Sequence, residues 1–311
     1  MAEEKDEGLS KEALRKKKRA QKLLAHALAI GNVEAQEAKT MAFSARAMVL
    51  ATLPYQDPGD VPSFGRENGG YSLSIQPGWD DKNKVSLGYP YGTIPRLLLA
   101  WITTEAAYTK SRTLKLGESL TDFMRQLGLR PTGGHFGSIT RLRSQMIRLF
   151  GARISCVYRG KDGFSMKHVN VAADAGLWWD PLQPDNTEKW HSGYIVLGYE
   201  FFQEIIARPV PLDLRVMQAI KQSPLALDIY AWLTYRMSYL KKETLIPWAS
   251  LRLQFGSDYA RPRAFKEHFL EQLRAVKMLY SHARFSTESE RGLTLYPSRP
   301  QVLKVPQDNL L

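Results

Sequence analysis

The stretch from Phe123 to Lys161 carries positive charge with no negative charge to balance it. It contains no Asp or Glu, and its eight cationic residues are Arg125, Arg130, Arg141, Arg143, Arg148, Arg153, Arg159 and Lys161. A solvated helical face in an ordinary domain mixes charges of both signs. The chemistry that this stretch could perform is therefore the binding of a polyanion, through ion pairs and charge-assisted hydrogen bonds.

The segment from Ser138 to Phe150 is predicted to form a helix that places part of this charge on one face. Its apolar residues form a core stripe, Ile139, Leu142, Met146 and Leu149, and the opposite face carries Arg141, Ser144, Gln145 and Arg148. Such side chains reach base edges and phosphates in the major groove of DNA. The alternative is a basic solvent-exposed face without a ligand. The candidate DNA-binding residues here are Arg141, Arg143, Ser144, Gln145, Arg148, Arg159 and Lys161.

The segment from Pro262 to Leu279 is predicted to form a second long helix. It would bury Phe265, Phe269, Leu273 and Val276, while its outer side mixes basic residues with Glu267 and Glu271. Recognition helices usually read bases with their first residues, and an acidic side chain can accept a hydrogen bond from cytosine. A mixed face therefore suits base reading, although it also suits plain solvation. The candidate DNA-binding residues here are Tyr259, Arg261, Arg263, Lys266 and Arg274.

Residues that could catalyse a reaction form no recognisable motif. The six histidines are scattered, with no spacing typical of metal ligands. Gly133, Gly134 and Gly137 lack the Lys-Ser/Thr pair that completes a phosphate-binding loop. We predict no catalytic residues, no cofactor, no metal site and no enzymatic activity. Carboxylates that converge only in three dimensions remain an alternative.

The whole chain has the size and charge of a two-domain nucleic-acid-binding protein. It has 311 residues, 44% of them hydrophobic, and a formal net charge of +12. Cys156 is its only cysteine, which fits a reducing compartment. It lacks an apolar run of about 18 residues, the length that a membrane-spanning helix needs. We expect a soluble, cytoplasmic protein without membrane contact.

The order of predicted elements indicates an α+β fold. Residues 1–53 form a basic, partly helical N-terminal arm whose helix continues to about Leu53, and residues 54–92 form a Pro/Gly-rich connector with one or two short strands. Residues 93–209 follow the order helix, strand, helix, Gly-rich turn, helix and hairpin, and residues 210–303 repeat it. The first hairpin is formed by residues 152–158 and 164–171. We predict two tandem winged-helix (helix-turn-helix) domains after a basic N-terminal extension, and a tail at 304–311.

Several segments resemble the plasmid-encoded RepA replication proteins. The similarity is most specific at Gly92–Ala106, Thr109–Arg112, Pro131–Gly134 and Ile139–Met146, and it extends less distinctly to about Arg299. A more remote similarity is to tandem winged-helix initiators that bind origin repeats called iterons, in which the second domain's long helix reads the repeat. The segment Arg261–Lys266 is similar to the start of that helix.

The resemblance implies a replication initiator that binds double-stranded DNA at repeats in a plasmid origin. It would help to open the duplex and recruit host replication proteins, such as a helicase or host initiator. In the remote group the first domain also mediates dimerisation and the monomer is typically the form that activates the origin, so the resemblance implies a homodimer as a possible partner state and leaves the active form open. The alternatives are a winged-helix transcriptional repressor and an origin-acting primase or nickase.

The last five residues, Gln307–Leu311, look like a weak form of the short motif that docks into bacterial sliding clamps. A glutamine is followed three and four residues later by apolar residues at a chain end. The alternative is a frayed terminus. The tail therefore predicts a sliding clamp as a further partner.

Overall fold

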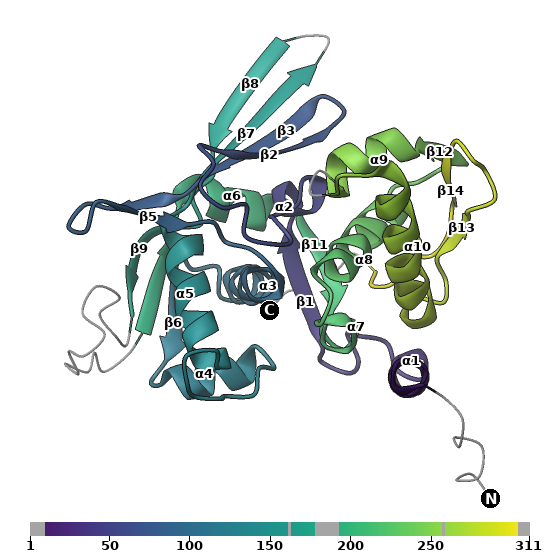
Figure 1. The fold of residues 1–311 in the computed structure, drawn as a ribbon, viewed down its shortest axis with the longest axis horizontal. Helices are drawn as coiled ribbons and strands as arrows, with labels where there is room; N and C mark the ends of the chain where they lie inside the picture. Colours follow the sequence, from purple (N-terminus) through teal and green to yellow (C-terminus); the bar gives the residue numbers. More distant parts are fainter. Residues whose placement is uncertain (1–9, 161–162, 178–192, 257–258, 304–311) are drawn as a thin grey trace, which may run out of the picture.

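The computed structural model describes residues 10–160, 163–177, 193–256 and 259–303. It has the predicted mixed α+β character, with its elements gathered around two hydrophobic cores (Figure 1). Residues between Phe43 and Ile205 build the first core, and residues from 210 onward build most of the second. We call the part around the first core the first half and the part from residue 210 onward the second half. None of the helices in the described ranges is long and apolar enough to cross a membrane.

The first half is organised around helix α3 (Thr93–Thr109), which is apolar on most of its surface and hence buried. Helices α4 (Leu120–Gln126), α5 (Ser138–Gly151) and α6 (Tyr199–Ala207) contribute to the same core. A three-stranded antiparallel sheet has the order β6-β10-β9, with bounds Thr113–Gly117, Gly193–Leu197 and Ala172–Gly176. The central strand pairs Ile195 with Leu114 on one side and with Ala175 on the other.

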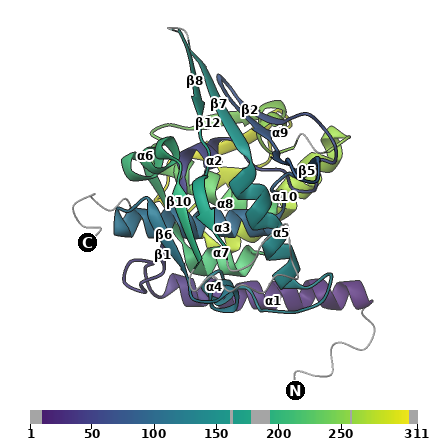
Figure 2. The ribbon, with the colours of Figure 1, turned by 90° about the vertical axis from the view of Figure 1, so that its left-hand side faces the viewer.

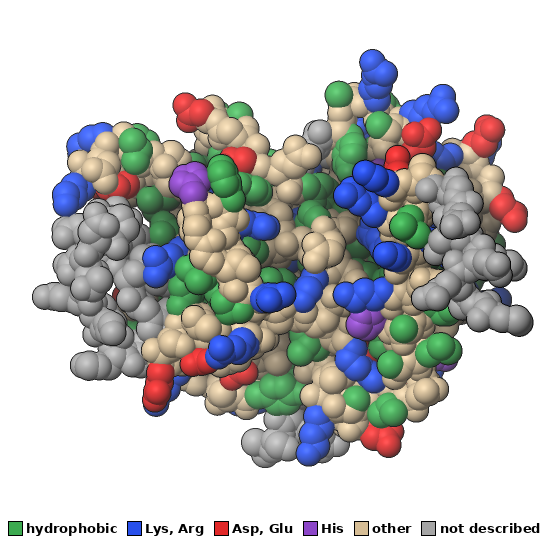
Figure 3. Space-filling view, turned by 60° about the horizontal axis from the view of Figure 1, so that its bottom comes forward, with side chains coloured by type: hydrophobic (Ala, Val, Ile, Leu, Met, Phe, Trp, Pro, Cys, Tyr) green, Lys and Arg blue, Asp and Glu red, His purple; other side chains and the backbone are tan. Residues whose placement is uncertain are grey.

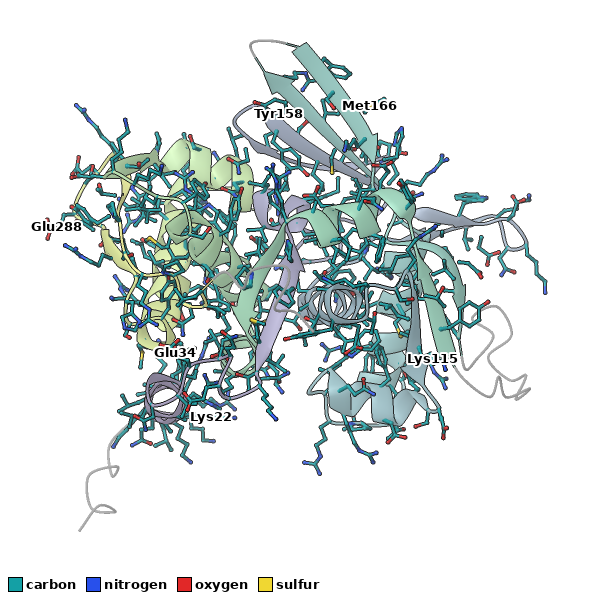
Figure 4. The ribbon with its side chains drawn as sticks, turned by 180° about the vertical axis from the view of Figure 1, so that it is seen from behind. Lys22, Glu34, Lys115, Tyr158, Met166 and Glu288 are labelled. Atoms are coloured by element: carbon teal, nitrogen blue, oxygen red, sulfur yellow. The ribbon has the colours of Figure 1, made fainter. Side chains whose placement is uncertain are left out.

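The predicted hairpin after α5 is present as β7 (Arg153–Gly160) and β8 (Gly163–His168), but its partner strand differs from that of a wing. It extends a four-stranded sheet, β2-β3-β7-β8, whose other strands are β2 (Phe64–Asn68) and β3 (Tyr71–Gln76). Strand β3 matches the buried residues of β7, pairing Ile75 with Ile154. The hairpin projects from the body and exposes Tyr158 and Met166 (Figure 4).

The connector is more structured than its Pro and Gly content suggests. Besides β2 and β3 it forms a second hairpin, β4 (Gly78–Asp80) with β5 (Val85–Gly88). Asp80 fixes the turn of this hairpin by accepting hydrogen bonds from the backbone N–H groups of Lys82 and Asn83 at 3.0 and 3.1 Å. The expectation of one or two short strands was therefore too low. The strands form two local hairpins, β2–β3 and β4–β5, and β3 in addition pairs with the remote strand β7, a partner that the Pro and Gly content does not indicate.

The N-terminal region is a helix for only part of its predicted length. Helix α1 (Lys11–Gly31) begins after the cap residue Ser10, and it packs on the second half through Leu23 and Ile30. The chain then forms β1 (Met41–Ala45) and the short helix α2 (Arg46–Leu50). The expectation of a helix to about Leu53 was wrong because β1 pairs with β11 (Pro209–Asp213), a partner remote in sequence.

The second half repeats the order of helices and strands around its own core. Its elements are α7 (Leu214–Ile220), α8 (Pro224–Met237), β12 (Thr244–Pro247), α9 (Trp248–Phe255), α10 (Pro262–Leu279), β13 (Arg284–Ser286) and β14 (Gly292–Tyr296). Ser223 caps α8 through the N–H of Ala226, and Pro224 and Pro262 stand in the first turns of α8 and α10. The sheet has the order β12-β14-β13.

Candidate nucleic-acid interface

The two long amphipathic helices, α5 and α10, lie on the same side of the molecule. Figure 1 shows both toward the viewer, and the perpendicular view of Figure 2 shows both on one side. Helix α5 buries Leu142, Met146 and Leu149. Helix α10 buries an apolar stripe that includes Phe265 and Phe269. Each helix therefore turns its apolar stripe inward and its polar residues away from the core.

Helix α1 adds cationic side chains to this side. Its first turns, at the N-terminal end, reach the side on which α5 and α10 lie (Figure 2). Exposed cations on α1 include Arg15, Lys18, Arg19 and Lys22, while Lys16 pairs with Glu12 at 2.9 Å. Viewed from below, Lys and Arg side chains gather along the middle of the molecule, and acidic side chains lie mostly toward its edges (Figure 3).

The first two turns of α5 present the exposed part of the predicted basic face. Arg141 is exposed, and Arg143 and Ser144 are partly exposed. Gln145 was expected on that face, but it is only 6% exposed and accepts a hydrogen bond from the N–H of Tyr91 at 2.8 Å. The connector packs across this part of α5, which the helix periodicity alone could not reveal.

Arg148 is also covered by the connector instead of lying free on the surface. Its Nη1 contacts Asp57 Oδ2 at 2.6 Å and donates to the carbonyl oxygen of Tyr89 at 3.2 Å. Its guanidinium carbon lies 5.2 Å from the centroid of the Tyr91 ring, and its side chain is 22% exposed. The prediction that Arg148 lies on an open, uniformly basic face is therefore wrong, because an acidic residue of the connector neutralises it.

The projecting hairpin carries one predicted residue that the structure describes. Arg159 is exposed on β7, and its guanidinium carbon lies 5.9 Å from the centroid of the Phe164 ring. Lys161 lies outside the described residues, as does the predicted clamp-docking tail, Gln307–Leu311.

The start of α10 brings together the predicted residues of the second half. Arg261 is exposed, and the side chain of Arg263 is 90% exposed and pairs with Glu267 at 2.8 Å. The Lys266 ammonium lies 4.9 Å from the centroid of the Trp248 ring. Tyr259 packs edge-on against Phe265 with a centroid distance of 5.8 Å.

Three further features bear on what this side can bind. Arg274 is exposed farther along α10. Phe136, in the turn before α5, is 89% exposed, a feature that the apolar pattern of the sequence did not single out. In the described ranges, no group of three or more His, Cys, Asp or Glu residues could hold a metal ion. Cationic and aromatic side chains are thus the main groups that this side offers, which suits phosphates and bases.

Residues 89–249 match the family described as plasmid encoded RepA protein. The chain belongs to this family of plasmid replication proteins. The match includes α3, the whole of α5 and the projecting hairpin, and it ends just inside α9. Helix α10 therefore lies beyond the part of this RepA-family chain that the family match covers.

The fold is also similar to a crystal structure of domains 2 and 3 of RctB. The TM-score is 0.53 with 12% sequence identity, and the similarity covers 80% of this RepA-family chain and 95% of the RctB chain. It therefore spans both halves of the molecule. A search of curated proteins gave no significant match.

Proposed function

We propose that the protein initiates plasmid replication by binding repeated sequences, iterons, in the plasmid origin. The observation that carries this proposal is that α5 and α10, each with a basic first turn or approach, lie on one side of a chain of the RepA family. We further propose that binding promotes opening of the adjacent duplex and recruits host replication proteins. The protein would act in the cytoplasm, where the plasmid is.

Strand order supports two tandem winged-helix domains, at residues 93–209 and 210–303. In a winged helix the strand before the second helix pairs with the last strand of the wing. The sheets β6-β10-β9 and β12-β14-β13 share this order, with β6 and β12 each leading into a helix. The first wing is then β9–β10, and the projecting hairpin β7–β8 is an addition. In this division residues 1–53 are the basic arm, 54–92 the connector and 304–311 the tail.

The proposed mechanism follows from how charge is distributed over α1, α5 and α10. Cations on α1 and Arg141 on α5 neutralise phosphates, which gives affinity for any duplex. The start of α10 combines Arg261 and Arg263 with Glu267, a set that can distinguish base edges. Binding at two helices on one side favours a bent duplex, and the deformation energy that this stores lowers the cost of opening.

A footprint on the plasmid's own origin tests the proposal most directly. We expect protection of repeated sites and an affinity that falls about 10³–10⁵-fold between 50 and 200 mM salt if 6–10 phosphates are contacted. Equal affinity for origin and random duplex, or a flat salt dependence, would contradict it.

Two further experiments separate initiation from the alternatives. An initiator supplied in trans sustains a plasmid that lacks its own initiator gene, whereas a repressor protects DNA without sustaining replication. We propose that the protein is not an enzyme. Incubation with origin DNA, nucleotides and a divalent metal should therefore yield neither primers nor nicks.

The partner proposals need separate measurements. We propose that the tail Gln307–Leu311 binds the sliding clamp, so its deletion should weaken clamp binding and leave DNA binding intact. We also propose a homodimer in solution. Sedimentation equilibrium would measure its mass. A monomer at all concentrations would contradict the homodimer.

A further inference from the structure

Phe136 is a large apolar side chain presented almost entirely to solvent. It is 89% exposed, more than any other large hydrophobic residue in the part of the chain that the structure describes. Burial of a phenylalanine is worth about 1.5–3 kcal/mol, and this side chain gains almost none of that stabilisation within the chain. The residue stands immediately before Gly137, the N-cap of α5.

The turn that carries Phe136 is held in one conformation. Ser138 Oγ donates to the carbonyl oxygen of Arg130 at 2.7 Å, and the N–H of Thr132 donates to Ser138 Oγ at 2.9 Å. Gly137 packs so closely that a Cβ there would lie 2.4 Å from two backbone oxygens. The ring of His135 contacts the Phe136 ring edge-on, with a centroid distance of 4.7 Å. The exposed ring therefore sits on a preorganised support.

Phe136 does not perform the packing role that its position often serves. An apolar residue just before the N-cap commonly packs against the fourth residue of the helix. In α5 that residue is Arg141, which is exposed and charged. Apart from its edge-on contact with His135, the ring is thus left in solvent and is free to contact another molecule.

The surroundings of Phe136 indicate the chemistry of that partner. Arg130 and Arg141, on either side in sequence, are both exposed. No acidic residue occurs between Phe123 and Lys161. An aromatic ring in a segment of the chain that carries cations and no acid fits stacked bases between phosphates better than it fits the mixed surface of another protein.

We propose that Phe136 is a wedge that inserts between two base pairs at the edge of the α5 contact and unstacks that step. Apolar side chains inserted in this way kink duplexes. The free-energy cost of unstacking the bases is offset by the additional protein surface that the bent DNA contacts. This inference rests on the proposed function, since it assumes that α5 lies on DNA. It adds the residue that converts binding into local distortion of the helix.

The test uses the full-length protein and duplexes of one origin repeat with 2-aminopurine placed at successive positions. Wild-type protein should raise 2-aminopurine fluorescence at a single step. Phe136→Ala should abolish that rise and weaken binding about 5- to 100-fold, the effect of losing one aromatic–base stack. Phe136→Leu, which keeps an apolar wedge, should retain part of the rise. The salt slope should be unchanged in both variants, because no phosphate contact is removed.

Tyr199→Ala is the matched control. Tyr199 is 57% exposed at the start of α6, which lies on the opposite side from α5 (Figure 2). It should behave as wild type. Circular dichroism would confirm that all variants are folded.

The outcomes distinguish this inference from the proposed function. If wild-type protein prefers the repeat and Phe136→Ala unstacks it equally well, the wedge is wrong and the function stands. If Phe136→Ala binds and distorts DNA normally but loses a host protein partner, the ring is a protein contact and the wedge is again wrong. If wild-type protein shows no preference for the repeat, the proposed function itself fails.

Discussion

Arg96 on α3 and Asp228 on α8 form a buried ion pair that joins the two halves of the molecule. The guanidinium is bidentate, with Nε 2.8 Å from Oδ1 and Nη2 2.7 Å from Oδ2, and the side chains are only 6% and 10% exposed. Arg96 also donates to the carbonyl oxygens of Leu53 and Gly92 at 2.7 and 2.6 Å. One side chain thus links both halves and holds the two ends of the connector, because Leu53 directly precedes it and Gly92 ends it.

Arg96→Met should destabilise the protein by about 3–5 kcal/mol, because it leaves a buried carboxylate without its counter-ion. Unfolding in urea measures this change. The double variant Arg96→Met/Asp228→Leu should recover much of the loss, since it removes both charges. A single variant as stable as wild type would show that the pair does not join the halves.

The same variant should change how stability depends on pH. Burial raises the pKa of Asp228, and Arg96 opposes this rise. Without Arg96 the pKa should rise further, so the folded state binds a proton that the unfolded chain has already released. The free energy of unfolding of Arg96→Met should therefore fall more steeply than that of wild type as pH rises above the ordinary aspartate pKa. Parallel pH profiles for the two proteins would contradict this assignment.

Arg141 and Arg148 should have separable effects although both lie on α5. Arg141 is exposed, so Arg141→Ala should weaken all duplexes alike and lower the salt slope by about one. Arg148 pairs with Asp57, so Arg148→Ala should lower the free energy of unfolding by about 1 kcal/mol and leave the salt slope unchanged. Asp57→Asn should reproduce the loss of stability. A reduced salt slope in Arg148→Ala would mean that DNA displaces Asp57.

Arg263→Ala should reduce sequence preference rather than stability. The Arg263 side chain is 90% exposed, and surface ion pairs such as that with Glu267 contribute little to folding. The variant should lose about 1–3 kcal/mol of binding free energy on the correct repeat, which reduces the difference in affinity between the correct repeat and mutated repeats. Titrations against cognate and scrambled repeats measure both. Arg208→Ala is the control, because Arg208 is an exposed arginine just after α6. If Arg263→Ala lost equal binding free energy on cognate and scrambled duplexes, Arg263 would contact phosphate rather than a base.

The Cys156 thiol should react slowly with a thiol reagent in the native protein. It is 8% exposed and lies 3.0 Å from the Tyr71 hydroxyl, and burial raises its pKa. The low exposure limits access to the sulfur, and the raised pKa lowers the fraction of thiolate. Labelling with Ellman's reagent at pH 8 should be far slower than after denaturation in urea. Equal rates would show that the sheet β2-β3-β7-β8 opens readily.

The sequence by itself determined the local features of the interface. The apolar spacing in α5 and α10 defined both helices and their buried stripes, since a helix on a core repeats its contacts every turn. The caps of α4 and α8 are local in the same sense, since the Ser119 and Ser223 side chains each accept a hydrogen bond from an N–H group three residues further on. The absence of acid between Phe123 and Lys161 is likewise a property of composition alone.

Only the tertiary structure decided which of these residues are accessible. Strand β1 pairs with β11 and β3 with β7, and no local pattern encodes partners so far apart in the chain. The connector covers Gln145 and Arg148, which helical periodicity alone places with Arg141. Phe136 has the large apolar side chain typical of a core residue, but its turn holds it in solvent. A side chain's exposure depends on what folds back over it, and that is set by long-range packing rather than by spacing along one helix.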